Sequence, residues 1–365
     1  MVTFLSFSGK EMVHAALLAM LITSQACIAF THAECMPKFP AILVFGDSTV
    51  DTGNNNYIFT PFKGNHRPYG QNFPGSVPTG RFSDGRLVPD DLASMLGLKD
   101  TVPPFLDPTL SDKDVATGVT FASAGSGYDD LTTAVTRVIP VSKQPEYFKS
   151  YIKRLEGIVG QREAARILSQ ALVIVSAGTN DFIFNFYDIP TRRFQYGIHE
   201  YQNFLHSKLH SFVKTLYDLG CRRIVVAGIP PIGCLPIQMT AKSPLLRNCS
   251  VKENEDAKAY NDKLEKLLPQ IETELAGSKV LYADIYNPLM DIINNPQQYG
   301  FAETKRGCCG TGILEAGPLC TRLEGVCTNP SLYLFWDSIH PSQATYKIIS
   351  EKLVQALLPK FSNMC

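Results

Sequence analysis

The sequence predicts an α/β protein, a three-layer α/β/α sandwich around a mostly parallel central sheet. Short apolar runs of strand length recur along the chain, and segments with the 3.6-residue spacing of amphipathic helices separate several of them. Small-residue turns with glycine follow the ends of several runs. Strands that alternate with helices in this way form parallel sheets with helices on both faces.

The expected elements are the following, in chain order. Strands are predicted at residues 42–45, 119–127 (running into a small-residue turn), 172–176, 224–228 and 280–284. Helices are predicted at 86–96, at 205–216 and, richly charged, at about 251–275. The last helix is expected to open at His340-Pro341, because proline suits the first helical position.

The first 33 residues differ from the rest of the chain. A basic residue precedes an apolar run at 12–22, and small residues follow, a pattern typical of a secretory signal peptide with cleavage after Ala29 or Ala33. The run is shorter than the roughly 20 residues of a membrane-spanning helix, which disfavours an uncleaved anchor. We therefore expect a signal peptide at 1–33 and a single domain at 34–365.

Charge excludes some kinds of partner. Lys+Arg and Asp+Glu both number 34, so the formal net charge is zero, and no basic cluster stands out. This argues against a nucleic-acid partner and against steering to anionic membranes. No later stretch is apolar enough to span a bilayer, so no stable membrane insertion is expected.

The ten cysteines fit a secreted protein. Cys27 would leave with the signal peptide, and the remaining nine imply at least one free thiol. The cluster formed by Cys308, Cys309, Cys320 and Cys327 lacks the Cys-x-x-Cys spacing of zinc sites, so we expect loop disulfides there, with connectivity left open. The sequon at Asn248 would mark an exposed glycosylated loop if used.

Two segments far apart carry the residues of a nucleophilic site. Ser48 follows the strand at 42–45, where ligands bind in open parallel sheets, although most serines in such places only cap a helix or close a turn. Asp337 and His340 are three residues apart, so the carboxylate can orient the imidazole ring. Together the three would form an acid–base–nucleophile set.

Further blocks at strand ends add candidate groups for an oxyanion. The small residues at 123–127 let backbone N–H groups approach a ligand closely, or form an ordinary tight turn. Asn180 can aim its amide at a developing oxyanion, or cap the next helix. The loop at 53–85 is expected to wall the site, with Asp51 as its support and Asn54-Asn55-Asn56 in positive φ or capping positions.

Two further patterns suggest other kinds of site, a nucleophile elbow and a metal site, and the sequence disfavours both. Ser123 lacks the glycine two residues before it that a nucleophile elbow needs, and the absence of Gly-x-Ser-x-Gly counts against an α/β-hydrolase. His206 and His210 are spaced like metal ligands on a helix but lack the accompanying glutamate, so a metal is disfavoured. The aromatic residues Phe182, Phe184, Phe186 and Tyr187 fit a pocket wall and a core equally.

With these motifs, the sequence resembles the GDSL esterase/lipase family of the SGNH-hydrolase superfamily, in particular its secreted plant branch. The resemblance covers about residues 41–358. The matching blocks are Phe45-Gly46-Asp47-Ser48 with Asp51-Thr52-Gly53-Asn54-Asn55-Asn56, Phe121-Ala122-Ser123-Ala124-Gly125, Gly178-Thr179-Asn180-Asp181 and Asp337-Ser338-Ile339-His340-Pro341.

The chain departs from the family pattern at three positions. Thr49 replaces the leucine of the family's name, and Thr120 and Ala124 stand where asparagine and glycine are more usual. The oxyanion glycine of the second block is therefore Gly125 by preference, with Gly127 as the second choice.

The resemblance implies an SGNH-hydrolase, flavodoxin-like fold and a carboxylic ester hydrolase. Ser48, Asp337 and His340 would be catalytic, and the N–H of Ser48, the N–H of Gly125 and the amide of Asn180 would form the oxyanion hole. No metal or organic cofactor is needed. The substrate would be a lipid or small acyl ester.

Other functions on the same fold stay open. An acyltransferase would use the same triad with an alcohol acceptor, and a non-catalytic secreted binding protein would use only the fold. In each case we expect a monomer that is secreted to the extracellular space, the apoplast or cell wall.

Overall fold

The computed structural model describes residues 38–134 and 136–364. The predicted signal peptide at 1–33 lies outside these residues. One compact unit, Lys38–Leu357, holds the sheet and all the elements described below. The last described residues, Leu358–Met364, form a short 3-10 helix that belongs to a second unit.

A four-stranded parallel sheet forms the centre of the first unit, as the sequence predicts. Its strands are β1 (Ile42–Gly46), β2 (Leu172–Ser176), β3 (Arg223–Ala227) and β4 (Lys279–Ala283), in the order β1-β2-β3-β4. Every residue of β1, β2 and β3 is buried, which explains their continuous apolar runs. Because the strands are parallel, their carboxyl ends meet at one edge.

The segment around Thr120 extends the sheet beyond β1. Val44 of β1 donates to Val119 O and accepts from Phe121 N, at 3.1 and 2.7 Å. The predicted strand at 119–127 is thus reduced to isolated bridges at Thr120, one of them to Pro104. With this segment included, the chain order across the sheet is that of flavodoxin-like folds, whose ligands bind where the order reverses, beside the first strand.

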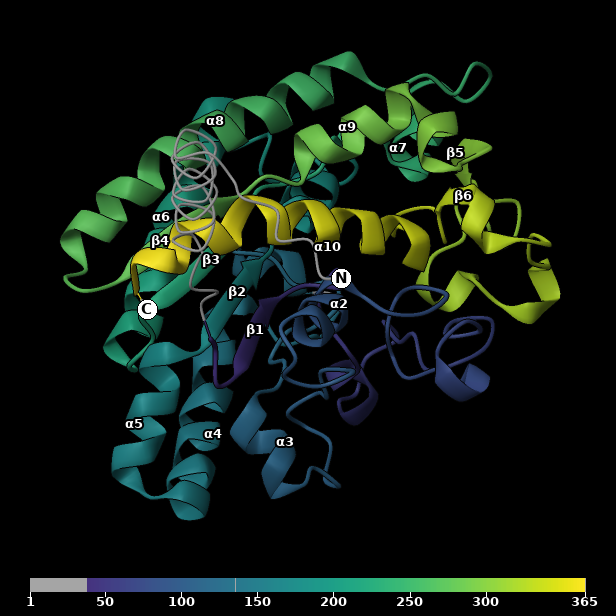
Figure 1. The fold of residues 1–365 in the computed structure, drawn as a ribbon. Helices are drawn as coiled ribbons and strands as arrows, with labels where there is room; N and C mark the ends of the chain where they lie inside the picture. The colour runs from purple at the N-terminus through teal and green to yellow at the C-terminus, as the bar shows by residue number, and fades with distance from the viewer. Residues whose placement is uncertain (1–37, 135, 365) are drawn as a thin grey trace, which may run out of the picture. The chain divides into compact units, whose positions relative to one another are not determined.

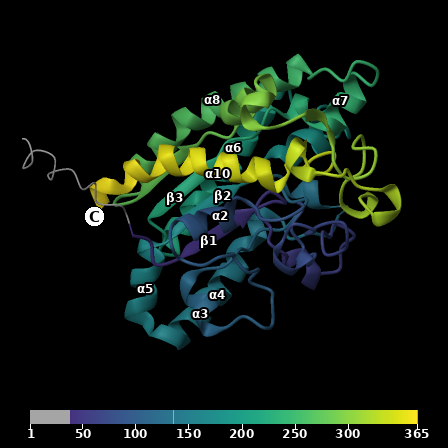
Figure 2. The ribbon, with the colours of Figure 1, turned by 45° about the vertical axis from the view of Figure 1, so that its right-hand side comes forward.

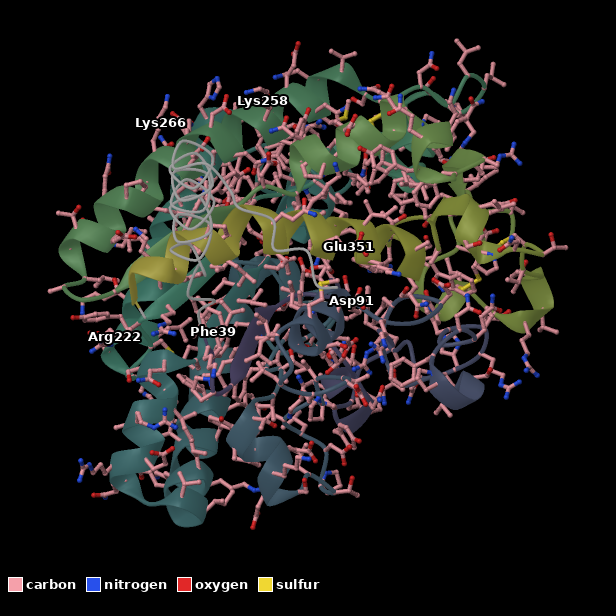
Figure 3. All side chains as sticks on the ribbon, in the orientation of Figure 1. Phe39, Asp91, Arg222, Lys258, Lys266 and Glu351 are labelled. Atoms are coloured by element: carbon pink, nitrogen blue, oxygen red, sulfur yellow. A yellow bond between two sulfur atoms is a disulfide. The ribbon has the colours of Figure 1, made fainter. Side chains whose placement is uncertain are left out.

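One face of the sheet packs against long helices. Phe45 of β1 lies in edge contact with Phe148 of α4 (Gln144–Val159) and with Phe212 of α6 (Ile198–Asp218). α5 (Gln161–Gln170) follows α4 directly, and α8 (Val251–Glu274) contacts both β4 and α6. Lys258 and Lys266 of α8 point away from the protein, which matches the charged helix expected there (Figure 3).

The other face is covered by α2 (Val88–Met95) and α10 (Gln343–Leu357), which pack on each other. α2 contacts β1, and α10 contacts β4 and α9 (Tyr286–Asn294). Figure 1 shows α10 crossing in front of the strands, and the turned view in Figure 2 keeps it on the same side. Helices on both faces of a parallel sheet make the three layers that the sequence predicts.

The remaining elements lie in the connections. Besides several short 3-10 helices, they are the short helices α3 (Asp112–Thr117) and α7 (Pro236–Lys242), a π-helix at Asp181–Tyr187, and the two-stranded sheet of β5 (Glu303–Gly307) and β6 (Tyr333–Phe335). Disulfides join Cys308 to Cys327 and Cys309 to Cys320 in the loop between β5 and β6, as the sequence favoured, and a third joins Cys234 to Cys249. Cys221 is a buried free thiol.

Two local predictions are wrong. α10 begins at Gln343 and not at Pro341, because the backbone N–H of Trp336 donates to His340 O and closes a tight turn first. Asn54, Asn55 and Asn56 do not have positive φ. The sequence left open whether the aromatic residues at 182–187 line a pocket or belong to the core, and Phe182 and Phe186 are core residues that pack on Tyr260 and Tyr201. Within the described residues no helix has both the length and the apolar character needed to cross a membrane.

Candidate active site

Ser48, His340 and Asp337 lie in hydrogen-bond contact, although 292 residues separate the first two. Ser48 Oγ is 2.8 Å from His340 Nε2. His340 Nδ1 lies 2.8 and 2.9 Å from the two carboxylate oxygens of Asp337. Asp337 is fully buried, whereas Ser48 and His340 keep 6% and 5% of their surface exposed. A serine, an imidazole and a buried carboxylate in this sequence have the geometry of a nucleophile, its base and the base's orienting group.

The position of Ser48 is set by the way β1 ends. Gly46 has φ of +141°, and a Cβ there would lie 1.8 Å from Ser176 O of β2, so only glycine fits. Asp47 N donates to the same Ser176 O at 3.0 Å. Asp47 also accepts two hydrogen bonds from Thr49, whose hydroxyl contacts Ser176 Oγ as well. The turn that carries Ser48 is therefore fixed to the end of β2.

A tight turn holds Asp337 and His340 together, as the three-residue spacing predicts. Asp337 Oδ1 accepts hydrogen bonds from the backbone N–H groups of Ile339 and His340, at 2.8 and 2.7 Å. Backbone donors of this kind stabilise a carboxylate and fix its direction. The ring of His340 also packs on Phe82, with 5.0 Å between ring centroids.

Asn180 lies against the small-residue turn of the second block. Its Nδ2 donates to Ser126 O at 2.8 Å, and a side-chain amide nitrogen carries two protons, so a second donor remains. Ser126 Oγ in turn donates to Gly46 O, two residues before Ser48. The second and third blocks therefore meet beside the end of β1.

The two candidate oxyanion glycines differ in their surroundings. Gly125 has φ of +90°, and a Cβ added there would lie 3.4 Å from the ring of Phe62. A Cβ on Gly127 would lie 2.1 Å from Asp181 Oδ1, so close packing against a carboxylate explains that glycine. The N–H groups of Ser48, Gly125 and Gly127 donate to no acceptor within residues 38–134 and 136–364.

Two buried carboxylates beside Ser48 have raised pKa values. Burial raises the pKa of Asp47 to about 6, and hydrogen bonds from Thr49 offset part of that effect. Burial likewise raises the pKa of Asp51 to about 6, against the hydrogen bonds from the N–H groups of Gly53 and Ala124. Asp51 therefore ties the loop after Ser48 to the second block, which is the supporting position expected for it.

The three consecutive asparagines fasten the same loop over long distances. Asn54 Nδ2 donates to Thr120 O and Ala122 O, and Asn55 Nδ2 donates to Ala124 O. Asn56 Nδ2 donates to Thr79 O. Their amides thus satisfy backbone carbonyls of the second block and of the loop's far end, which explains the run better than turn geometry does.

The patterns set aside in the sequence have structural explanations. Ser123 Oγ donates to Asn55 Oδ1 and accepts from Ile139 N. The His206 ring stacks on Tyr260, and His210 Nε2 is 2.8 Å from Glu274. Among the described residues no group of three or more His, Cys, Asp or Glu side chains is arranged to hold a metal ion.

The sequence did not reveal two residues that contact this site. Tyr69 reaches Asp337 from the loop at 53–85, and Gln144 of α4 bonds the backbone of Gly46. The loop's length indicated that it would wall the site, but a tyrosine among prolines and glycines gives no pattern that singles it out.

A parallel α/β sheet with serine, histidine and aspartate at one edge is an arrangement used by serine hydrolases as a class. Comparison with known proteins gives the family. The model of the GDSL-like Lipase/Acylhydrolase family matches residues 42–353, most of the chain. The chain therefore belongs to this family, and it is a carboxylic ester hydrolase.

Relatives in Arabidopsis thaliana are similar in sequence to this chain over nearly the full length of both proteins. GDSL esterase/lipase At2g31550 is 56% identical over 339 residues, 92% of this chain and 94% of its own. GDSL esterase/lipase At2g30310 is 55% identical, covering 94% of this chain and 96% of its own. GDSL esterase/lipase At1g06990 is 54% identical, covering 93% and 96%.

Proposed function

We propose that the protein is a secreted serine esterase or lipase that cleaves lipid or small acyl esters through a Ser48–His340–Asp337 triad and an acyl-enzyme. The contact that carries this proposal is the 2.8 Å distance between Ser48 Oγ and His340 Nε2, with the Asp337 carboxylate on the other ring nitrogen. A serine hydroxyl is a weak nucleophile until such a base accepts its proton.

In the proposed mechanism, His340 Nε2 takes the proton of Ser48 as Oγ attacks the ester carbonyl. Asp337 keeps the Nδ1 proton on its own side of the ring, so that Nε2 is free to accept. The N–H groups of Ser48 and Gly125 and the free amide proton of Asn180 stabilise the oxyanion. His340 then protonates the leaving alcohol, and water attacks the acyl-enzyme with His340 as base. No metal or organic cofactor takes part.

The secretory part of the proposal rests on the cysteines. Three disulfides in the described residues require an oxidising compartment, as outside the cell. Asn248 is exposed beside the Cys234–Cys249 disulfide, which suits a glycosylated loop. A monomeric protein in the apoplast or cell wall fits these features.

A fluorophosphonate probe tests the nucleophile directly, because it forms a stable adduct only with an activated serine. Wild type, Ser48→Ala and the control Ser94→Ala, an exposed serine of α2, would be labelled and mapped by peptide mass. We expect an adduct on Ser48 in wild type and in Ser94→Ala, and none in Ser48→Ala. Wild-type protein that is folded but unlabelled would refute the proposed triad.

A second experiment tests whether water or an alcohol accepts the acyl group. It uses an ester substrate supplied with and without a primary alcohol. Release of free acid at an unchanged rate in both conditions supports hydrolysis. Transfer of most acyl groups to the alcohol at millimolar concentration would instead assign an acyltransferase that uses the same residues.

A further inference from the structure

The Asp337 carboxylate receives one hydrogen bond from outside its own turn. The N–H groups of Ile339 and His340 and the ring of His340 come from the next three residues. Within the described part of the chain, the remaining donor is the hydroxyl of Tyr69, which lies 2.7 Å from Oδ2 although 268 residues separate it from Asp337. The hydroxyl of Tyr69 therefore connects the turn that carries Asp337 to the loop at 53–85.

The hydroxyl of Tyr69 is itself oriented by a second bond. The backbone N–H of Gly317 donates to Tyr69 Oη at 2.7 Å. A phenol has one proton to give, so a donor on its oxygen directs that proton towards the carboxylate, and the two bonds strengthen each other. Burial, with the nearby Asp337 charge as a further cause, raises the pKa of Tyr69 well above its usual range, so the hydroxyl keeps its proton.

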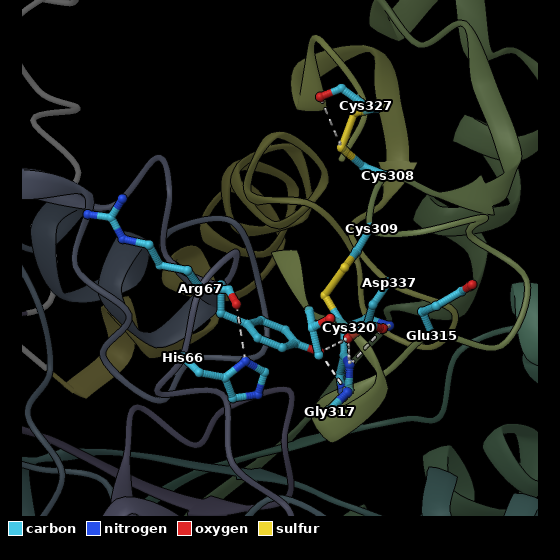
Figure 4. Close-up of a disulfide and its surroundings, with 12 residues drawn as sticks. His66, Arg67, Cys308, Cys309, Glu315, Gly317, Cys320, Cys327 and Asp337 are labelled. Carbon is cyan, nitrogen blue, oxygen red and sulfur yellow. Dashed lines mark hydrogen bonds and ion pairs between the residues drawn. A yellow bond between two sulfur atoms is a disulfide. The ribbon is translucent and has the colours of Figure 1, made fainter. Parts of the chain in front are cut away.

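The surroundings hold this arrangement rigidly. Tyr69 is completely buried in a cluster with Phe82, Trp336 and the Cys309–Cys320 disulfide. Gly317 lies three residues before Cys320, and Figure 4 shows Gly317 close to this disulfide and to Asp337. The loop between β5 and β6 is also bonded to the segment that precedes Asp337, because Cys309 N donates to Trp336 O at 2.8 Å.

Resting on the function proposed above, we propose that Tyr69 is a positioning residue for the reaction: it fixes Asp337 by hydrogen bond and withdraws negative charge from the side facing His340. The Gly317 N–H is the group that orients Tyr69. The hydroxyl of Tyr69 bonds to Asp337 and Gly317 and not to Ser48, so we assign its effect on catalysis to Asp337.

The proposal predicts a change in pH dependence. Without the Tyr69 hydroxyl, the negative charge of Asp337 is less dispersed and attracts positive charge on the ring of His340 more strongly, so the acid limb of the kcat/KM profile should move to higher pH. The other titratable groups in the electrostatic environment are Asp47 near His340, and Tyr346 near Asp337, Asp47 and Asp84. These residues are unchanged in the variant, so a shift reports on the lost hydroxyl.

The experiment compares Tyr69→Phe with Tyr151→Phe in the full chain. Tyr151 of α4 is a matched control, because its buried hydroxyl also donates one hydrogen bond, to Val115 O of α3 at 2.8 Å. We expect Tyr69→Phe to lower kcat about tenfold, as the loss of one hydrogen bond to a charged group would, with KM nearly unchanged. The midpoint of the acid limb of kcat/KM should rise, by up to about one pH unit. Tyr151→Phe should keep the wild-type midpoint.

Two readouts guard against partial misfolding. The midpoint of a pH profile does not depend on the fraction of active protein, and the downfield proton NMR signal of His340 Nδ1–H reports the Asp337 contact without any turnover. We expect this signal to move in Tyr69→Phe and to stay in place in Tyr151→Phe. An unmoved midpoint and an unmoved signal in Tyr69→Phe, with active wild type, would overturn the positioning role alone. Wild type that neither hydrolyses esters nor reacts with the fluorophosphonate would overturn the proposed function and this role with it.

Discussion

The side-chain amide of Gln144 pairs with both backbone groups of Gly46. Gln144 Nε2 donates to Gly46 O at 2.8 Å, and Gly46 N donates to Gln144 Oε1 at 2.9 Å. Gln144 is the first residue of α4 and is completely buried. Through this pair α4 bonds to the last residue of β1, two residues before Ser48.

Replacing Gln144 should therefore disturb the position of Ser48. Gln144→Ala leaves the buried Gly46 N–H without a partner, which should lower the free energy of unfolding by about 1–3 kcal/mol. Ester hydrolysis should fall as well, because the turn of Ser48 loses a support. Urea unfolding and kcat/KM measure the two effects. Gln161→Ala, at the exposed first residue of α5, is the control and should change neither.

Gly46 should tolerate no side chain. In Gly46→Ala the new Cβ would meet backbone oxygen of Ser176 at 1.8 Å, and φ of +141° is strained for alanine, so little folded protein is expected. Gly157→Ala in α4 has nothing within 4 Å of the added Cβ and should stabilise the protein by about 0.5–1 kcal/mol. Yield of secreted protein and melting temperature compare the two. A normally folded Gly46→Ala would contradict the close approach of β1 to β2.

Asn180 should be needed for a normal kcat, but Ser48 should still react slowly without it. Asn180→Ala removes one oxyanion donor, so kcat should fall about 10²- to 10³-fold while fluorophosphonate still labels Ser48 slowly. Steady-state kinetics on a chromogenic ester measure the loss. Asn203→Ala, an exposed asparagine of α6, should retain wild-type kcat. Equal kcat in wild type and Asn180→Ala would remove Asn180 from the oxyanion hole.

The disulfides should differ in their effect on catalysis. Changing either Cys309 and Cys320 or Cys234 and Cys249 to serine opens loops of similar length, 11 and 15 residues, and should cost about 2–4 kcal/mol of stability in each case. Only the first pair holds the loop that presents Gly317 to Tyr69. We therefore expect the Cys309/Cys320 variant to have lower kcat per labelled Ser48 than the Cys234/Cys249 variant. The same kcat in both would separate the loop from catalysis.

Thermal stability should decline as pH rises from 6.5 to 8. Burial raises the pKa of Asp181 to about 7 and that of Asp51 to about 6, far above the roughly 4 of an unfolded aspartate. The folded state holds protons that the unfolded state has released, so this contribution to stability is complete below pH 4 and is lost as pH rises, through about 6 for Asp51 and through about 7 for Asp181, so that Asp181 dominates above pH 6.5. The slope is roughly 1 kcal/mol per pH unit for each carboxyl that is still protonated.

The window is chosen to avoid groups of opposite sign. Burial lowers the pKa of His206 to about 4 and that of Lys99 to about 8. His206 therefore makes stability rise with pH only below about pH 6.5, and Lys99 does so only above about pH 8. Calorimetric melting temperatures at constant ionic strength test the prediction. A melting temperature that rises across the window would mean that the buried aspartates are ionised when folded.

The sequence predicts those parts of this protein that depend on local pattern. The strands at β1, β2, β3 and β4 are continuous apolar runs, and Ser48, Asn180 and the Asp337–His340 turn occur in short blocks at their ends. The start of α10 was misplaced because the backbone bond from Trp336 to His340 depends on how the turn folds, which proline statistics do not report.

Contacts between distant segments could not be predicted in the same way. Tyr69 and Gln144 carry no motif, and their function depends on where a long loop and a helix start lie in space. The run Asn54-Asn55-Asn56 was visible, but its partners are carbonyl oxygens that any residue supplies. Disulfide connectivity was open for the same reason.

The 292 residues between Ser48 and His340 also bear on how the enzyme is made. Because the base lies near the end of the folded unit, a nascent chain with a complete β1 has an inert serine. In the proposed mechanism, Ser48 becomes reactive only after the turn that carries His340 has emerged and packed beside it. In that mechanism, a chain cut short before this turn therefore has no base for Ser48 and no ester-hydrolysing activity.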